Sequence, residues 1–162
     1  MTNARDNRGV TLVEMLVVLG IIAVLATIIF TLTKAMETQS KERATANVFA
    51  LLRSALHEYY DDTGSFPPQP ERNLAEVQTH IINLYVALDS VPASRQVLDQ
   101  VNGAFLKVAR PDPQEPELIV MCDPWGMPLD YIYVDGAQFP ELISAGPDKT
   151  FGTNDDISSR GM

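Results

Sequence analysis

The segment Ser144–Ser158 holds the chain's densest group of side chains that could bind a metal ion. It contains three aspartates among serine, threonine and asparagine residues, and two glycines that let the backbone fold back. Hard cations such as calcium take about six to eight oxygen ligands from carboxylates, hydroxyls and backbone carbonyls. Asp148 and Asp155 lie seven residues apart, so a loop must bring them together. The spacing and terminal glutamate of an EF-hand are absent.

An acidic, solvated turn is the alternative interpretation of this segment. Two features favour a bound cation: three crowded carboxylates repel one another unless they are neutralised, and a short terminal strand would fray without a clamp. The acidity is local, because residues 111–162 hold 2 basic and 10 acidic side chains in a chain of formal net charge −9. The overall charge argues against a broad basic surface for nucleic acid, so we expect no nucleic-acid partner.

The sequence contains no motif of an enzyme active site. A Gly-rich phosphate loop, a Gly-x-Ser-x-Gly turn and a His-Glu-x-x-His helix are all missing from it. The single cysteine, Cys122, excludes an internal disulfide, and we expect it to be a small buried residue in a strand. His57 and His80 are unrelated in position, and we interpret His80 as a helix surface residue. We therefore predict that the chain is not an enzyme.

A long apolar run precedes these features. Val10–Leu32 comprises 23 residues with one charge, Glu14. As a helix it would span roughly 34 Å, enough for a bilayer core of about 30 Å. The run is too long for the core of a cleaved secretory signal, and no A-x-A-like site follows it. We predict a retained transmembrane helix, with Arg5 and Arg8 holding its N-terminus in the cytoplasm.

Glu14 is the unusual residue of this run, because a carboxylate inside a membrane costs a few kcal/mol. It lies only five residues into the run, so it could sit at the level of the lipid headgroups. Alternatively it pairs with a cation on a neighbouring subunit, most simply a free amine at Val10. The position of Glu14 leaves both interpretations open.

Residues 8–16, Arg-Gly-Val-Thr-Leu-Val-Glu-Met-Leu, resemble the type III signal of the type IV pilin and pseudopilin superfamily. The resemblance implies that a prepilin peptidase cuts between Gly9 and Val10 and methylates the new N-terminus. Glu14 then becomes the fifth mature residue and neutralises a neighbouring amine, which sets the axial register of a filament. Val10 stands where the family usually has Phe.

The remaining pattern predicts an α+β fold in which a long N-terminal helix, half transmembrane, packs on a small antiparallel β-sheet head of the pilin type. Residues 34–62 lack Pro and Gly, so we expect one helix from Val10 to Asp62, ended by Gly64. An extra helical region follows at 71–100, with a break at Pro92 and a short helix at 93–101. The expected strands are 104–110, 117–122, 129–134 and 139–144.

Three further stretches are similar to the major pseudopilin family of type II secretion: Asp123-Pro-Trp-Gly-Met-Pro with Tyr131, residues 143–148, and residues 155–157. The resemblance implies that the C-terminal loop binds calcium. By match, Asp148 and Asp155 are carboxylate ligands. Further ligands, some through backbone oxygen, are Leu142, Ser144 and Asp156. Lys149 stands where the family often has Gly.

The resemblance divides the chain into a leader (1–9), a transmembrane and filament-core helix (10–32) and a periplasmic head (33–162) with a calcium loop at 142–158. It implies a structural subunit of a type II secretion pseudopilus, polymerised with itself and other pseudopilins to drive protein export across the outer membrane. The prepilin peptidase and an inner-membrane assembly platform would be its partners. The subunit would cross the inner membrane once, with a cytoplasmic N-terminus, before it joins the periplasmic pseudopilus.

Three alternatives remain open: a type IV pilin for adhesion or DNA uptake, a minor pilin-like subunit, and an anchored binding module that never polymerises. The absence of a C-terminal disulfide pair argues against a typical type IV pilin. The resemblance covers roughly residues 1–66 and 118–158. Residues 67–117 form a longer stretch than we expect for a major pseudopilin and carry no recognised motif.

Overall fold

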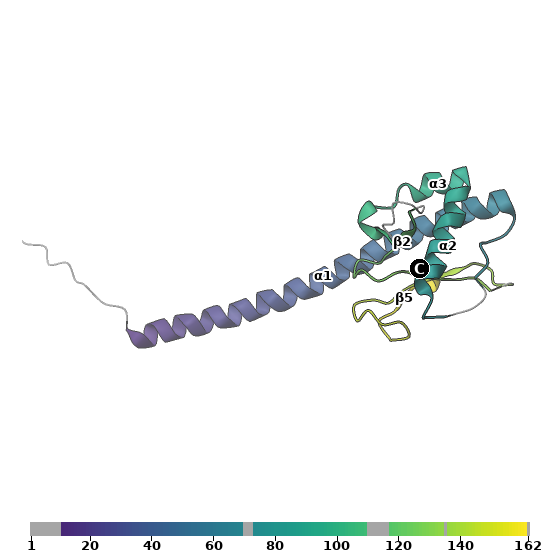
Figure 1. Cartoon of the computed structure of the whole chain (residues 1–162). Coiled ribbons are helices and arrows are strands. Elements are labelled where there is room, and N and C mark those ends of the chain that lie inside the picture. The colour runs from purple at the N-terminus through teal and green to yellow at the C-terminus, as the bar shows by residue number, and fades with distance from the viewer. Residues whose placement is uncertain (1–10, 70–72, 110–116, 135, 162) are drawn as a thin grey trace, which may run out of the picture. The chain divides into compact units, whose positions relative to one another are not determined.

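The computed structural model describes residues 11–69, 73–109, 117–134 and 136–161 (Figure 1). The chain divides into two compact units, residues 1–39 and residues 40–162. Helix α1, Leu12–Thr63, contributes residues to both units. The predicted single long helix is therefore confirmed over its described part, and the predicted start at Val10 lies outside the described residues.

The first half of α1 matches the expected membrane span. Among the described residues, α1 is the one helix long and apolar enough to cross a membrane, with a mean hydropathy of 2.9 in its most apolar window. Large apolar side chains along this half, such as Leu12, Leu19 and Leu32, are exposed. They provide the apolar surface that a membrane or a helical neighbour would cover.

Helix α1 ends at Thr63, one residue after the predicted end at Asp62 and directly before Gly64. Gly64 adopts a φ of +78°, a left-handed conformation that glycine enters without steric cost. Its N–H donates to the carbonyl of Tyr60 at 2.8 Å, which satisfies one of the last carbonyl groups of the helix. The prolines at 67 and 68 then prevent the helix from continuing.

Two shorter helices follow within the predicted helical region 71–100, and the first begins only at Val77, since the described residues 73–76 are not helical. The two helices are α2, Val77–Ser90, and α3, Pro92–Leu98. Pro92 separates them because it cannot donate within α2, whereas the first turn of α3 needs no N–H from it. Helix α3 was predicted at residues 93–101. It begins one residue earlier, at Pro92, and ends three residues earlier, at Leu98. A 3₁₀ turn, Gly103–Phe105, leads into the strands.

The strands form two small antiparallel sheets. The first pairs β1, Leu106–Val108, with β2, Ile119–Met121. The second has the order β3-β4-β5, with β3 at Asp130–Ile132, β4 at Glu141–Ser144 and β5 at Ile157–Ser158. The four predicted strands are confirmed as shorter segments, whereas β5 was not among them because two residues carry no periodic signal.

The core of residues 40–162 joins the second half of α1 to α2 and to both sheets. Helix α2 packs on β2 and β3. The largest fully buried apolar side chains are Phe49, Leu52, Leu56, Ile81, Leu84, Leu88, Met121, Leu129, Tyr131 and Leu142. Cys122 is 3% exposed, which confirms the prediction of a small buried residue, and burial raises the pKa of its thiol. It lies directly after β2 rather than in the strand as predicted, and forms an isolated bridge with Pro128.

His80 is not the surface residue that its lone position on a helix suggested. Its side chain is 4% exposed, and its Nδ1 lies 3.0 Å from Oδ1 of Asp130, which is completely buried on β3. The pair bridges α2 and β3 across 50 residues of sequence. The interpretation of His80 was wrong because its partner is distant in the sequence, and a buried imidazole requires such a partner.

Candidate assembly and cation sites

Glu14 lies in the first turn of α1, where it forms a capping box with Thr11. The Glu14 N–H donates to Thr11 Oγ1 at 3.2 Å, and the Thr11 N–H donates to Glu14 Oε2 at 3.5 Å. This reciprocal pair satisfies two of the N–H groups that a helix start leaves without intrahelical partners. The carboxylate also complements the positive end of the helix dipole. Gly9 and Val10, the predicted processing residues, lie outside the described residues.

The capping box was readable from the sequence, because Thr-x-x-Glu before an apolar run is its signature. It gives Glu14 a local role within its own subunit, in addition to any pairing with a neighbour. These two roles make different demands on the side chain. A capping box accepts glutamine, whereas neutralisation of an amine requires the carboxylate charge.

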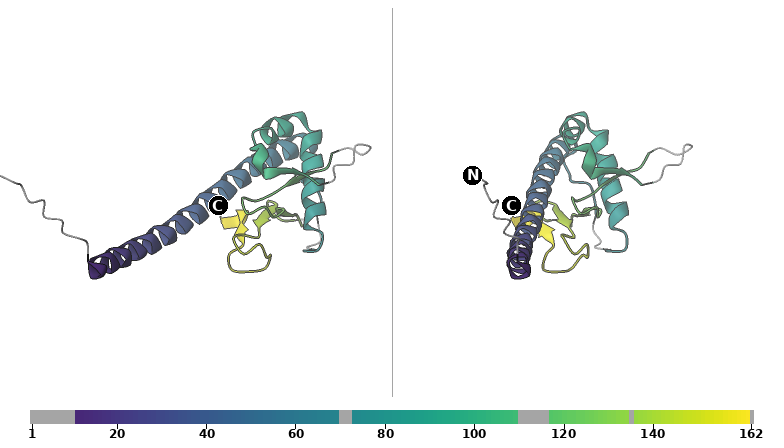
Figure 2. Two further views of the ribbon diagram at one scale, coloured as in Figure 1. Left: turned by 60° about the vertical axis from the view of Figure 1, so that its left-hand side comes forward. Right: turned by 90° about the vertical axis from the view of Figure 1, so that its left-hand side faces the viewer.

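The predicted cation loop projects away from the strands between β4 and β5 (Figure 2). Asp155 closes it from within: Oδ2 accepts from the Asp148 N–H at 2.9 Å, and Oδ1 accepts from the Thr153 hydroxyl at 2.6 Å. These two hydrogen bonds, the hydroxyl bond first, lower the pKa of the Asp155 carboxyl group. The predicted meeting of residues 148 and 155 therefore occurs, with the backbone of Asp148 rather than its carboxylate as the partner.

Asp156 and Asp148 face other donors of the same loop. Asp156 Oδ2 accepts from the Gly152 N–H at 2.7 Å, and Asp148 Oδ1 accepts from the Thr150 N–H at 2.8 Å. The second oxygen of Asp156, Oδ1, is buried and has no hydrogen-bond partner among the described residues. A buried acceptor without a donor is costly, and a cation would satisfy it.

Left-handed backbone conformations occur at three positions of the loop, Gly146, Lys149 and Gly152. Gly146 has a φ of +65° and lies so close to the carbonyl group of Asp155 that a Cβ atom would overlap with it. Lys149 has a φ of +62°, where a non-glycine residue costs about 1 kcal/mol. This explains physically why glycine suits position 149 in the family that the sequence resembles.

The remaining predicted ligands, Leu142 and Ser144, belong to β4. The Leu142 side chain is buried in the core, and its N–H donates to Ser159 Oγ at 2.9 Å. The Ser144 hydroxyl donates to Asp123 Oδ2 at 2.7 Å, and its oxygen accepts from the Gly146 N–H at 3.2 Å. Only the backbone carbonyl groups of these two residues are therefore suited to bind a cation.

The donor set fits a hard cation in its chemistry. Carboxylate, hydroxyl and carbonyl oxygens occur together in one loop, and Asp156 Oδ1 has no hydrogen-bond partner among the described residues. Within the described ranges, no three His, Cys, Asp or Glu side chains are grouped closely enough to share an ion. Any ion would thus rely on backbone carbonyls and on local adjustment of the loop.

Asp123 is the residue at this site that sequence reasoning missed. It is 4% exposed, and its Oδ1 accepts from the N–H groups of Trp125 at 3.0 Å and Met127 at 2.9 Å. The sequence signal was present, because an aspartate at the start of a turn with Pro and Gly commonly bonds the backbone two residues on. The bond to Ser144 spans 21 residues and has no such local signal.

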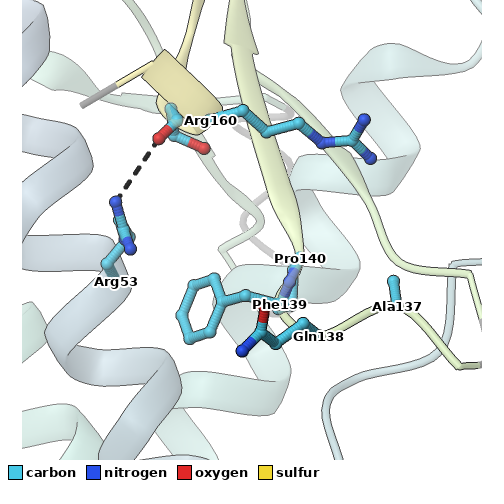
Figure 3. Close-up of a pocket in the computed structure, with 7 residues that line it drawn as sticks. Arg53, Ala137, Gln138, Phe139, Pro140 and Arg160 are labelled. Carbon is cyan, nitrogen blue, oxygen red and sulfur yellow. Dashed lines mark hydrogen bonds between the residues drawn. The ribbon is translucent and has the colours of Figure 1, made fainter.

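A separate pocket of about 300 Å³ lies beside α1 (Figure 3). An Arg53 N–H donates to the Ser159 carbonyl at 3.4 Å, and the Arg53 guanidinium lies 5.2 Å from the centroid of the Phe139 ring. Arg160 pairs with Glu141 at 3.2 Å, and Figure 3 shows its side chain extending away from Arg53. Both arginines thus have partners within the protein, and the hydrogen bond of Arg53 holds Ser159 against α1.

Comparisons with known proteins identify the family of this chain. Residues 4–30 match the family model of the prokaryotic N-terminal methylation motif. The chain is 31% identical over 160 residues to the type II secretion system core protein G of Escherichia coli K12, covering 96% of this chain and 92% of that protein. The similarity therefore also includes the stretch at 67–117. No solved structure matches the chain significantly. By this identity and coverage, the chain belongs to the family of type II secretion core protein G, the pseudopilins.

Proposed function

We propose that this chain is a structural subunit of a type II secretion pseudopilus. The observation that carries the proposal is the combination of an N-terminal methylation motif with an exposed apolar helix and a carboxylate in its first turn. An exposed apolar surface of this length needs either lipid or other helices around it. Polymerisation transfers the helix from lipid to contact with the helices of other subunits.

Maturation and topology follow from this function. The prepilin peptidase cleaves between Gly9 and Val10 and methylates the new amine. The subunit waits in the inner membrane with its N-terminus in the cytoplasm and its head in the periplasm. An inner-membrane assembly platform then adds it to the filament together with other pseudopilins, and filament growth drives folded proteins through the outer membrane. The role is structural and requires no catalytic residue.

Glu14 is the residue that we expect to control assembly. Its carboxylate neutralises the N-terminal amine of an adjacent subunit, because an unpaired charge of either sign is costly in a filament core. The Glu14→Ala variant should reach the membrane at wild-type level but lose most filament formation and secretion. The measurement is a filament assay by shearing and immunoblotting, together with secretion of a reporter substrate.

Two matched variants separate the charge from the helix cap. Glu14→Gln keeps the capping box but removes the charge, and Thr11→Ala removes the cap but keeps the charge. We expect Glu14→Gln to fail like Glu14→Ala and Thr11→Ala to assemble. Normal assembly of Glu14→Gln would contradict the proposed neutralisation of an amine by Glu14, since the carboxylate charge would then have no role. A chain that retains residues 1–9 in the membrane would instead support an anchored module that never polymerises.

We also propose that the loop at 142–158 binds calcium. Asp148, Asp155 and Asp156 would hold the ion with backbone carbonyls, which include those of Leu142 and Ser144. The buried Asp156 Oδ1 without a donor supports this proposal. Bound calcium would supply two positive charges that offset the repulsion among the loop carboxylates.

Calcium should raise the thermal midpoint of the full chain in detergent micelles by several degrees. At a calcium concentration 100-fold above Kd, binding to the folded state alone contributes about 2.7 kcal/mol. Circular dichroism melts with calcium, with magnesium and with excess chelator provide the measurement. Asp155→Asn should abolish the rise. Asp62→Asn, an exposed carboxylate at the end of α1, should preserve it. Equal midpoints in calcium and chelator would leave the loop as a solvated acidic turn.

A further inference from the structure

The buried carboxylate of Asp123 connects two loops that are distant in sequence. On one side it closes its own turn through the N–H groups of Trp125 and Met127. On the other side it accepts the hydroxyl of Ser144, which is completely buried at the end of β4. One carboxylate thus receives three hydrogen bonds at 2.7–3.0 Å, which fixes the turn and β4 relative to each other.

The connection continues from Ser144 into the acidic loop. The Ser144 oxygen accepts from the Gly146 N–H, which places Gly146 at the entrance of the loop. Gly146 packs so closely on Asp155 that only a residue without a Cβ atom fits at this position. A Cβ atom built on Gly146 would also lie 3.2 Å from Asp155 Oδ2. Asp155 in turn receives the Asp148 N–H. An unbroken series of contacts therefore runs from Asp123 to Asp155 and Asp148, two of the three aspartates expected to bind the cation.

We propose that Asp123 is a positioning residue for the cation loop, although it is not itself a ligand. This inference rests on the calcium proposal made above. Asp123 holds the Ser144 hydroxyl, Ser144 holds Gly146, and Gly146 sets the place of Asp155. Without the carboxylate the loop would have to order itself as the ion binds, and the affinity would fall by the cost of that ordering. Residues that support ligands in this way commonly change metal affinity 10- to 100-fold.

The position of the loop depends on the two acceptor oxygens of the Asp123 carboxylate, and not only on the shape of the side chain. Both oxygens of Asp123 accept, so Ser144 must donate its single proton to Oδ2 and keep its lone pairs for the Gly146 N–H. In Asp123→Asn the amide can still accept the two turn N–H groups through its oxygen. Its NH₂ group would then face the Ser144 oxygen as a second donor beside the Gly146 N–H, and the Ser144 hydroxyl proton would lose its acceptor. The turn survives in this variant, whereas its connection to the loop is weakened.

Trp125 provides a direct readout of the connection. It is the chain's single tryptophan, it is half-buried, and its backbone N–H donates to Asp123 Oδ1. If the contacts transmit the ordering of the loop, calcium binding changes the fluorescence of Trp125. A residue that only stabilises the fold would lower the melting temperature without altering this response.

The experiment titrates the full chain in detergent micelles with calcium chloride and follows Trp125 fluorescence and isothermal heat. We expect Asp123→Asn and Ser144→Ala each to weaken calcium binding at least tenfold and to lose the fluorescence change. The double variant should bind calcium about as weakly as either single variant, because both interrupt the same connection. Leu88→Ala, a core change in α2, is the matched control: it should lower the melting temperature but leave the calcium affinity unchanged.

The possible outcomes separate this inference from the proposal beneath it. Wild-type affinity in both Asp123→Asn and Ser144→Ala, with a normal response of the wild-type chain, overturns the positioning role and leaves the calcium site intact. Loss of affinity in Ser144→Ala alone also overturns it, since Ser144 would then act as a ligand. A wild-type chain that neither binds calcium nor melts later in its presence contradicts the calcium site, and the positioning role with it.

Discussion

Replacing His80 with alanine is expected to lower the free energy of unfolding by about 3 kcal/mol and the melting temperature by about 10 °C. Asp130 is completely buried, and its Oδ2 already has no hydrogen-bond partner among the described residues. Removal of the imidazole would leave the whole carboxyl group without a donor in the core. A polar group buried in this way carries its full desolvation cost, which is larger for a charged group.

Urea denaturation of the full chain in detergent micelles, followed by near-ultraviolet circular dichroism, provides the measurement. His80→Asn is the conservative control, because its amide nitrogen can approach Asp130 as Nδ1 does, and it should recover about half of the loss. His57→Ala tests an exposed histidine, whose ring contacts the Phe139 ring in a tilted arrangement with centroids 4.8 Å apart, and should cost about 1 kcal/mol. An unfolding energy of His80→Ala within about 0.5 kcal/mol of the wild type would contradict the structural role of the pair.

Gly146→Ala should have an effect of similar size on the C-terminal loop, again about 3 kcal/mol. The new Cβ would overlap with the Asp155 carbonyl group, which is backbone and cannot rotate away. The positive φ adds steric strain of about 1 kcal/mol. The loop can relieve the overlap only by moving Asp155, which would release its hydrogen bond to Asp148.

Gly152→Ala is the matched control, because Gly152 also has a positive φ, +89°, but has no heavy atom within 4 Å of the Cβ position. It should carry the conformational strain alone and lose about 1 kcal/mol. Thermal melts of both variants, with limited proteolysis to detect an opened loop, make the comparison. Equal losses in the two variants would show that the contact between Gly146 and Asp155 contributes nothing to stability.

The elements of this fold were predictable where their signals are local. The apolar run and the absence of Pro and Gly over residues 34–62 predicted α1, and Gly64 predicted its end. Pro92 likewise predicted the break between the two shorter helices, because the effect of proline on a helix is local. Strand β5 was missed because its two residues show no alternation, and its pairing with β4 depends on tertiary structure.

The candidate sites were predictable only in part, for a related physical reason. The position of Glu14 and the crowding of aspartates after residue 147 are features of neighbouring residues. Hydrogen bonds between distant polar residues leave no periodic trace, as with His80 and Asp130, or Asp123 and Ser144. In both pairs the tertiary fold brings the buried partners together.

The burial of Cys122 makes this chain convenient for chemical labelling. The thiol is shielded from solvent and its pKa is raised by burial, so the reactive thiolate is scarce at neutral pH. Because the sequence contains no other cysteine, a cysteine introduced on an exposed position would be the principal target of a maleimide reagent. Crosslinks between such introduced cysteines could therefore map which faces of adjacent subunits meet in the filament, without first removing the native residue.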